Sequence, residues 1–553
     1  MSHRFLFTAF ISVLISIVTL TQTYSQLSLL KDINPGEDGC WVNLGFNRKE
    51  HIIPLKDNLA FLIVDDEEHG VEPWITDGTS EGTKLLKDIY EGPKSSFPLF
   101  SLKVGDKIFF FAKTEKEGIE LWVTDGTTEG TIFLKDIYEG ETSSRYVNVQ
   151  SYPQIEYHGK YLFVAATKTS SASLFVSDGT PEGTTLIDNT CPACIMSHPS
   201  SMQIINDKVY FFLDDALYES DGTDVGTKEV INFKIRPNFF DRRELTAIKD
   251  KLYFRGGYNN ETEPYISDGT PSGSKLLKDI SPGDKSSYPT FFTGFDDKAF
   301  FTANNHIYTT DGTTEGTVPF NTRLYMALDR YNQRNPYYVF GDHMYFIAAT
   351  DPAYGNLYRL DKGSNDAKMV IEFGGYIQDI FEMVPFNGKF FIEDIKSNEL
   401  CVFDPDTKKH RALTDFTKNR RFERSPNVSE ITLLDNKLIF FATTDEYGKE
   451  LWTYDLDSFI TSTPKQAIDP ANITLQSNPV HDVLRVSLPD DVSSGSLTFN
   501  ILNLRGQIVA SYENLRIQGS TTELDIERLN PGVYSLQVVH RGKLTKTLKF
   551  LKL

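Results

Sequence analysis

Cysteine is scarce in this chain of 553 residues, which contains only four. That number is too small for a disulfide-stapled scaffold. Cys191 and Cys194 form a lone CxxC pair, and a zinc site would need a second such pair. A redox site would need a βαβ setting that the pattern does not show. We therefore expect a local disulfide between Cys191 and Cys194, and the relation of Cys40 to Cys401 stays open.

Positive charge is also in deficit, because 56 Lys and Arg face 76 Asp and Glu, for a formal net charge of −20. Such a chain repels phosphate backbones and anionic lipid, so we expect no nucleic-acid partner. The sequence contains no Gly-x-Ser-x-Gly, His-Glu-x-x-His, phosphate loop or dinucleotide fingerprint. Its ten histidines form no motif with a partner. Because none of these motifs is present, we predict no catalytic residue from the sequence.

Long apolar runs are confined to the N-terminus, at residues 5–20. This run is too short for a comfortable membrane span, and polar residues follow it. The pattern predicts a secretory signal peptide over residues 1–26. An uncleaved anchor is the alternative, but no stop-transfer pattern follows the run, so the mature chain is expected to have no transmembrane span.

Aromatic residues, in contrast, are abundant at 13%, which suits β-sheet. Asp-Gly-Thr follows an aromatic-bearing segment six times, and the aspartates recur about every 47 residues, a period typical of propeller repeats. Three degenerate copies of the motif continue this spacing at Asp361, Asp404 and Asp455. The six complete copies are at Asp77, Asp125, Asp178, Asp221, Asp268 and Asp311.

Each repeat divides into four predicted strands, at residues 100–104, 107–113, 120–124 and 131–137 in the second unit. Residues that tolerate positive φ, such as Asn206-Asp207, join the first two strands. The second strand is almost continuously apolar, which indicates that both of its faces are covered. Each unit therefore reads as a blade packed between two neighbours.

The outer strand repeats as Leu-Lys-Asp-Ile at residues 86–89, 134–137 and 277–280. An early copy at residues 30–33 precedes the first complete unit, and the last unit has none after it. We therefore expect an all-β fold in which residues 27–460 form a β-propeller closed by the N-terminal strand. The aspartates indicate nine blades, with eight as the alternative if a degenerate unit near residues 318–410 is absorbed elsewhere.

The string Glu120-Leu121-Trp122-Val123-Thr124-Asp125-Gly126-Thr127 resembles the ELWxxDGT repeat family. That family occurs in secreted bacterial proteins. The resemblance implies a propeller-like architecture and carries no activity.

The repeated aspartates allow two interpretations. Carboxylate and carbonyl oxygens suit calcium, which is the metal-binding interpretation. Alternatively, each Asp caps the amides of its own turn, Gly supplies positive φ and Thr begins the next strand. A residue needed once per blade is usually needed by the blade, so the sequence favours a structural role, with no metal and no cofactor, and calcium remains the alternative.

Glutamates precede the aromatic residue in five units. We expect them in the loop between the second and third strands, on a rim shared with long insertions at residues 34–48, 138–150 and 189–201. Loops on a rigid scaffold collect binding residues, so this rim is a candidate acidic, aromatic face for a cationic, sugar or protein partner. The alternative is solubility and hairpin hydrogen bonding. The five residues are Glu72, Glu120, Glu263, Glu399 and Glu450.

The C-terminal part of the sequence lacks the Asp-Gly-Thr repeat. Residues 461–472 resemble a linker, and residues 473–553 alternate short strands with turns at Asn478-Pro479, Arg505-Gly506 and Asn530-Pro531-Gly532. This rhythm predicts a small antiparallel β-sandwich. An ordinary accessory sandwich would suffice for it.

Three motifs in this part, in order, resemble the C-terminal sorting domain of type IX secretion substrates. They are Asn478-Pro479-Val480, the segment 502–509 and Leu529 to Tyr534, followed by a Lys-rich last strand. The resemblance implies export through the outer membrane of a Gram-negative bacterium of the Bacteroidota kind, by the type IX secretion machinery. It also implies removal of the domain by a sortase, with release or attachment at the cell surface.

The sequence therefore predicts an exported propeller whose role is non-enzymatic binding or adhesion to an unknown protein or glycan ligand. A secreted propeller hydrolase or lyase acting on polysaccharide is the alternative, and a purely structural surface-layer protein is a third reading. An enzyme should bring two or three carboxylates with perturbed pKa values into one pocket.

Overall fold

The computed structural model describes the chain as two compact units, Met1–Asp457 and Ser458–Leu553. The residues that the structure describes are 26–36, 39–41, 51–56, 58–145, 153–170, 173–187, 202–213, 216–233, 245–258, 261–283, 285–321, 323–326, 335–351, 354–372, 383–393, 397–416, 427–459, 473–476, 478–488, 497–503, 508–513, 521–540 and 543–553. Residues 1–25 of the predicted signal peptide, the linker and the CxxC pair lie outside these ranges.

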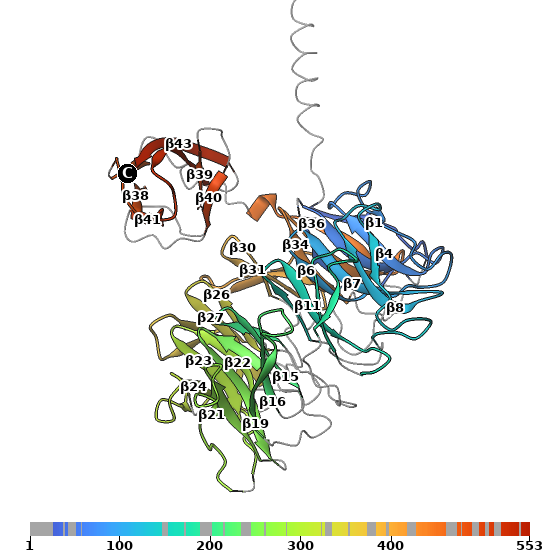
Figure 1. Ribbon diagram of the computed structural model, residues 1–553. Coiled ribbons are helices and arrows are strands. Elements are labelled where there is room, and N and C mark those ends of the chain that lie inside the picture. Colours follow the sequence, from blue (N-terminus) through green and yellow to red (C-terminus); the bar gives the residue numbers. More distant parts are fainter. Residues whose placement is uncertain are drawn as a thin grey trace, which may run out of the picture. The chain divides into compact units, whose positions relative to one another are not determined.

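The described residues of the first unit form nine four-stranded antiparallel sheets (Figure 1). Eight of them use four consecutive strands each, and we number them sheets 1 to 8 in chain order. Sheets 1 to 4 contain β2 (Ile52–Pro54), β3 (Ala60–Asp65), β4 (Val71–Thr76), β5 (Lys84–Leu85), β6 (Leu99–Val104), β7 (Lys107–Thr114), β8 (Gly118–Thr124), β9 (Ile132–Lys135), β10 (Gln154–Tyr157), β11 (Lys160–Ala165), β12 (Ser173–Ser177), β13 (Thr185–Ile187), β14 (Gln203–Ile205), β15 (Lys208–Leu213), β16 (Ala216–Ser220) and β17 (Lys228–Asn232).

Sheets 5 to 8 contain β18 (Leu245–Ile248), β19 (Lys251–Tyr258), β20 (Glu261–Ser267), β21 (Lys275–Leu276), β22 (Thr290–Phe295), β23 (Lys298–Ala303), β24 (His306–Thr310), β25 (Val318–Pro319), β26 (Tyr337–Phe340), β27 (His343–Asp351), β28 (Tyr354–Asp361), β29 (Ala367–Glu372), β30 (Met383–Phe386), β31 (Lys389–Glu393), β32 (Leu400–Asp404) and β33 (Lys409–Ala412).

Sheet 9 joins the two ends of this unit. It contains β34 (Ser429–Leu434), β35 (Lys437–Thr444), β36 (Gly448–Asp455) and, as its fourth strand, β1 (Leu27–Lys31) from the N-terminus. β1 pairs antiparallel with β36, and Ser28 lies opposite Thr453. The blue and orange ribbons lie side by side in Figure 1 for this reason.

The second strands are covered on both faces, as their apolar sequence predicts. In β7 the ring of Phe110 packs on Phe61 of sheet 1, with centroids 5.2 Å apart. Its neighbour Phe109 points the other way and stacks on Tyr161 of sheet 3 at 4.7 Å. Successive side chains of a strand point to opposite faces, so one apolar strand contributes to two cores.

Each sheet packs against the next one through a shared hydrophobic cluster, from sheets 1 and 2 to sheets 7 and 8. After sheet 8, Phe416 contacts Trp452 of sheet 9 with ring centroids 4.9 Å apart. Sheet 9 in turn shares a cluster with sheet 1 that includes Leu30, Leu62 and Phe441. The first strands of several neighbouring sheets approach one another, which makes the fourth strands the outer ones. This arrangement is propeller-like and all-β.

The second unit is a two-layer sandwich of a three-stranded and a four-stranded antiparallel sheet. Leu484 and Leu524 of one sheet share a core with Phe499 and Leu536 of the other. A short 3-10 helix, η1 (Asp457–Phe459), spans the boundary between the units. The strands are β37 (Thr474–Leu475), β38 (Val483–Ser487) and β41 (Thr521–Asp525) in the first sheet, and β39 (Leu497–Leu502), β40 (Ile508–Glu513), β42 (Gly532–His540) and β43 (Lys543–Lys552) in the second.

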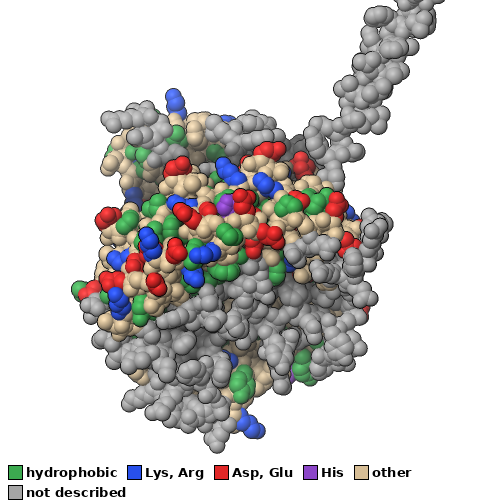
Figure 2. Space-filling view, turned by 90° about the vertical axis from the view of Figure 1, so that its right-hand side faces the viewer, with side chains coloured by type: hydrophobic (Ala, Val, Ile, Leu, Met, Phe, Trp, Pro, Cys, Tyr) green, Lys and Arg blue, Asp and Glu red, His purple; other side chains and the backbone are tan. Residues whose placement is uncertain are grey.

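The described part of the face drawn in Figure 2 carries basic and acidic side chains interspersed with apolar ones. Among the described residues, no helix has the length and apolar character needed to cross a membrane.

Candidate functional site: the loops that join neighbouring sheets

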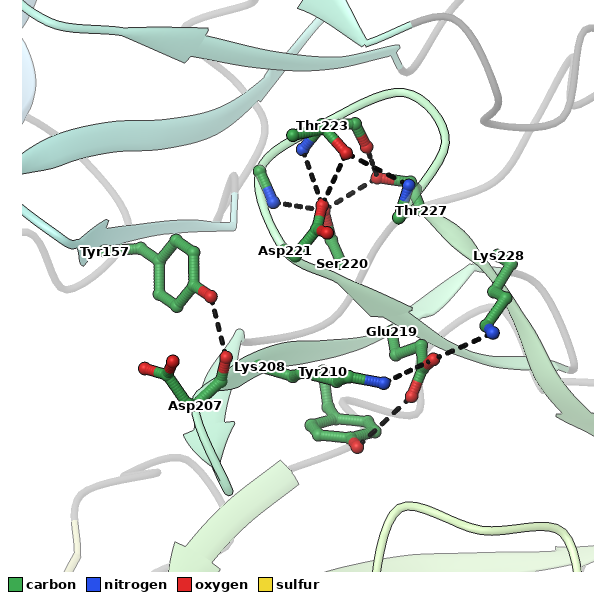
Figure 3. A network of polar contacts seen from close by, with 12 residues as sticks. Tyr157, Asp207, Lys208, Tyr210, Glu219, Ser220, Asp221, Thr223, Thr227 and Lys228 are labelled. Atoms are coloured by element: carbon green, nitrogen blue, oxygen red, sulfur yellow. Dashed lines mark hydrogen bonds and ion pairs between the residues drawn. The ribbon is translucent and has the colours of Figure 1, made fainter.

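The Asp-Gly-Thr turn is a closed hydrogen-bond network, drawn for Asp221 in Figure 3. Asp221 Oδ1 accepts hydrogen bonds from Thr223 N at 2.9 Å and from Thr223 Oγ1 at 2.6 Å. Thr223 Oγ1 accepts one from Gly226 N at 3.0 Å, and Thr227 Oγ1 donates to Thr223 O at 2.7 Å. One carboxylate oxygen thus holds the turn between the third and fourth strands.

All six complete copies make the bonds between Asp and Thr, at Asp77, Asp125, Asp178, Asp221, Asp268 and Asp311. The hydrogen bond from the Thr313 hydroxyl, together with that from its amide, lowers the pKa of Asp311. Within the described ranges, no three His, Cys, Asp or Glu residues are grouped so that they could hold a metal ion.

A second glycine of this turn escaped the sequence reasoning. It lies five residues after each aspartate, at Gly82, Gly130, Gly183, Gly226, Gly273 and Gly316. A Cβ atom at Gly130 would overlap the carboxylate of Asp125, and the other five positions are equally tight. Its regular recurrence after Asp-Gly-Thr was the available signal.

The five repeated glutamates do not lie on an exposed rim, so that part of the prediction is wrong. Four of them lie within third strands, and Glu399 immediately precedes β32. All five are buried, and Glu72, Glu120 and Glu450 have no exposed surface. The third strand of sheet 2, β8, begins at Gly118, which is earlier than predicted. Glu120 therefore lies within the strand and not in the loop that precedes it.

Glu72 shows what these carboxylates do. It accepts hydrogen bonds from Ile89 N at 3.1 Å and from Ser96 N at 2.8 Å, 17 and 24 residues further along the chain. Ser96 Oγ donates a further bond at 2.6 Å. Glu120 holds Ile137 and Ser144, and Glu263 holds Ile280 and Ser287, at the same spacings. Each carboxylate therefore anchors the loop that leaves its own sheet.

The anchored serine then reaches the following sheet. Ser96 O accepts a hydrogen bond from Lys113 N of sheet 2 at 2.7 Å. Ser144 O accepts one from Ala166 N at 2.8 Å, and Ser287 O accepts one from Asn304 N at 2.7 Å. Glutamate, loop serine and the neighbouring strand thus form a staple between consecutive sheets.

The same staple joins sheet 9 to sheet 1. Glu450 accepts hydrogen bonds from Ile33 N at 3.2 Å and Asn34 N at 2.9 Å, across almost the whole first unit. Cys40 stands in place of the serine, since its N donates to Lys449 O at 3.1 Å and its O accepts from Asp65 N at 3.0 Å. Burial raises the pKa of the Cys40 thiol, and Glu450 raises it further.

Burial also changes the titration of the glutamates. It raises the pKa of Glu72 to about 7 and that of Glu120 to about 7, despite the hydrogen bonds that they accept. Burial likewise raises the pKa of Glu450. These three carboxylates belong to three different sheets, and each one is committed to its own loop.

The lysines of the Leu-Lys-Asp-Ile motif are a second link between sheets that sequence reasoning missed. Lys87 Nζ of sheet 1 donates to Thr131 O of sheet 2 at 2.7 Å. Lys278 does the same toward Thr317 O at 2.6 Å. Lys31 of β1 donates to Thr83 O of sheet 1 at 2.5 Å. In these three copies the lysine of the motif therefore caps the Asp-Gly-Thr turn of the next sheet.

Two exposed aromatic side chains follow the stapled serines. Phe97 follows Ser96 and is 39% exposed, and Tyr288 follows Ser287 and is 60% exposed. Both have positive φ angles, 48° and 50°, which bulky residues rarely adopt. At the matching position after Ser144, Arg145 is instead buried, 4.0 Å from the ring centroid of Phe111.

The cysteines outside the CxxC pair lie in different hydrophobic clusters. Cys40 belongs to the cluster between sheets 9 and 1, and Cys401 to the cluster between sheets 7 and 8. The disulfide predicted between Cys191 and Cys194 concerns residues outside the described part of the chain.

In the second unit, two of the three motifs hold the last strand. The side chain of Asn478 accepts a hydrogen bond from Leu551 N at 2.9 Å and donates one to Lys549 O at 3.1 Å. Val480 forms a parallel bridge with Lys552. The ring of Tyr534 stacks on Phe550 with centroids 5.6 Å apart. Both motifs therefore fix β43 against the sandwich.

Residues 477–552 match the family model of the secretion system C-terminal sorting domain. No curated protein matches the chain. Among solved structures, a puromycin hydrolase is 11% identical with a TM-score of 0.36, and the alignment covers 62% of this chain and 58% of that one. The chain thus spans somewhat more than half the length of that hydrolase.

Two other solved structures show similarly low likeness. An oligogalacturonate lyase in complex with manganese is 10% identical with a TM-score of 0.30, over 54% of this chain and 87% of that one. The extracellular domain of the putative one component system BT4673 from B. thetaiotaomicron is 9% identical with a TM-score of 0.22, over 91% and 86%. The match over residues 477–552 identifies the second unit as a type IX secretion sorting domain, which directs this chain to the cell surface or the medium.

Proposed function

We propose that the first unit is a nine-bladed propeller that β1 closes into a ring. We also propose that an N-terminal signal peptide starts its export and is then cleaved. The recurrence of one staple supports closure, because Glu450, Cys40 and Lys31 link sheet 9 to sheet 1 as their counterparts link consecutive sheets. Ring closure packs the free faces of the first and last sheets against each other, and β1 covers the edge of β36. We propose as well that the repeats are of the ELWxxDGT type and that the protein comes from a Gram-negative bacterium of the Bacteroidota kind.

We further propose that this propeller is a non-enzymatic binding or adhesion module. The observation that carries this function is the matched pair Phe97 and Tyr288, two exposed rings on positive-φ backbone beside stapled serines. Such backbone conformations cost of order 1–3 kcal/mol and persist only where surrounding contacts impose them. Glu72 and Glu263 supply those contacts, so the rings are presented rigidly to a glycan or protein surface.

The carboxylates with raised pKa values favour binding over catalysis. An active site would need two or three of them to converge. Glu72 and Glu120 instead lie in different sheets, and backbone amides of their own loops occupy both. A secreted hydrolase or lyase acting on polysaccharide remains the alternative proposal.

A glycan and protein binding screen on the secreted full-length chain tests this function. We expect binding to at least one ligand, no turnover of it, and loss of most of the affinity in the Phe97→Ala/Tyr288→Ala double variant. Leu186→Ala is the matched control, because Leu186 is 45% exposed but lies on the outer strand β13. Cleavage of the bound glycan would overturn the proposal in favour of the alternative. An equal loss of affinity in Leu186→Ala would show that Phe97 and Tyr288 do not form the binding site.

A further inference from the structure

The outer strand of sheet 8 differs from the other outer strands in charge. β33 reads Lys409-His410-Arg411-Ala412, and all four residues are exposed, as is Lys408 before them. Each of the other eight outer strands contains at most one basic residue. In a chain with a net charge of −20, this strand edge concentrates positive charge.

Two acidic residues beside β33, Asp404 and Asp406, are already engaged. Asp404 lies opposite Lys409 in the strand pair, but its carboxylate accepts a hydrogen bond from Lys389 at 2.7 Å and from the amides of its own turn. Asp406 lies 3.4 Å from Arg359. Their charge is thus balanced from within sheets 7 and 8, and little of it offsets the row on β33.

Contacts to the neighbouring sheets hold this row in place. Lys408 Nζ donates to Met369 O of sheet 7 at 3.0 Å. Arg411 forms a side-chain hydrogen bond with Tyr454 of sheet 9. Between them, Lys409 and His410 point to opposite faces of the strand, since successive side chains alternate. Both faces of the edge therefore present positive or hydrogen-bond-donating groups.

We propose that β33, with Lys408, binds an acidic polysaccharide whose carboxylate or sulfate groups run along this strand edge. An extended chain can meet side chains on both faces of an edge, whereas a flat bilayer meets only one. Export to the surface or the medium brings the protein to such polymers. The other outer strands contain one lysine or none, so four basic residues exceed what protection from edge pairing needs here. This surface is separate from Phe97 and Tyr288.

Retention of the secreted full-length chain on polygalacturonate beads, compared with neutral dextran beads, tests this surface. We expect retention on polygalacturonate only, and its loss when salt rises from about 50 to 500 mM, because exposed charges are screened. The Lys409→Glu/His410→Glu variant should bind about tenfold more weakly, as expected from a few exposed charge contacts of up to ~1 kcal/mol each. The Lys84→Glu/Lys275→Glu variant is the control, because both lysines are exposed on outer strands.

Several outcomes would overturn the inference. These are equal retention on both polymers, equal loss of retention in the control variant, or binding to phosphatidylglycerol vesicles without binding to polygalacturonate. If the charge reversal disturbs folding, the Lys409→Gln/His410→Gln variant replaces it in the test. This milder variant should also bind polygalacturonate more weakly than the parent chain. Failure here leaves the aromatic site untouched, since the two tests change different residues.

Discussion

At the scale of single residues, a carboxylate and a glycine are interlocked in every Asp-Gly-Thr turn. A Cβ atom at Gly130 would overlap the Asp125 carboxylate, which must then release the Thr127 hydroxyl and amide. We expect Gly130→Ala to destabilise the first unit by about 2 kcal/mol, the usual scale for loss of a cap with local strain. The shift of the denaturation midpoint in urea measures it.

The Asp125→Ala/Gly130→Ala double variant is the control for that expectation. Removing the carboxylate removes the atom with which the new methyl group collides, so the double variant should be no less stable than Asp125→Ala alone. Residues in contact give such non-additive effects. Strict additivity of the two single losses would contradict the steric explanation.

The buried glutamates predict an unusual pH dependence. Burial raises the pKa of Glu72 and of Glu120 from 4.5 to about 7, so the folded state holds protons that the unfolded state has released. Their contribution to stability is complete below pH 4.5 and is lost as the pH rises to about 7, by roughly 3 kcal/mol for each group.

Thermal melts between pH 5 and 8 measure this loss. Glu120→Gln should make the profile less steep, because glutamine does not titrate while Glu72 still does, whereas Glu129→Gln at an exposed position should leave it unchanged. A Glu120→Gln profile as steep as that of the parent chain would show that this carboxylate does not titrate as stated.

At the scale of elements, the N-terminal strand is the fourth strand of a sheet made by the end of the unit. Removing residues 27–33 takes Leu30 and Ile33 out of the core and leaves the buried Glu450 without the hydrogen bond from Ile33 N. Burial of the two side chains alone is worth about 3–6 kcal/mol. We expect a lower melting temperature and aggregation through the exposed edge of β36.

Melting temperature and light scattering of this deletion, measured beside the chain that begins at residue 27, test the role of β1. Lys31→Ala serves as an intermediate variant, because it keeps β1 and removes the side-chain contacts of Lys31 to Thr83 O, Ser80 O and the Trp74 ring. An unchanged melting temperature in the deletion would contradict the assigned role.

Strand positions could be predicted because hydrophobic runs and turn residues are local signals, and β6 to β9 lie close to the predicted ranges. The role of the glutamates was not predicted, because their partners lie in loops 17 and 24 residues away. The constant spacing from Glu72 to Ser96, Glu120 to Ser144 and Glu263 to Ser287 was a usable signal. No local spacing could connect Glu450 to Ile33 and Cys40.

At the scale of the whole molecule, the second unit carries the sorting domain that directs export. Truncation after Pro464 removes the sorting domain and leaves the sheets of the first unit intact in sequence. We expect a folded product that stays in the periplasm, while the full-length chain reaches the medium or the cell surface. Immunoblots of the culture fractions and a melt of the retained product measure this, and normal secretion of the truncated chain would refute the sorting role.

The measurement that tests ring closure most directly is a disulfide between the two ends of the first unit. Ser28 and Thr453 are register partners in β1 and β36, a separation that a disulfide spans. The Ser28→Cys/Thr453→Cys variant of the secreted chain should yield the cross-linked peptide by mass spectrometry without reduction, and the register-shifted Ser28→Cys/Asp455→Cys variant should yield little. Absence of the link in the first variant, or equal yields in both, would contradict a propeller closed by its N-terminal strand.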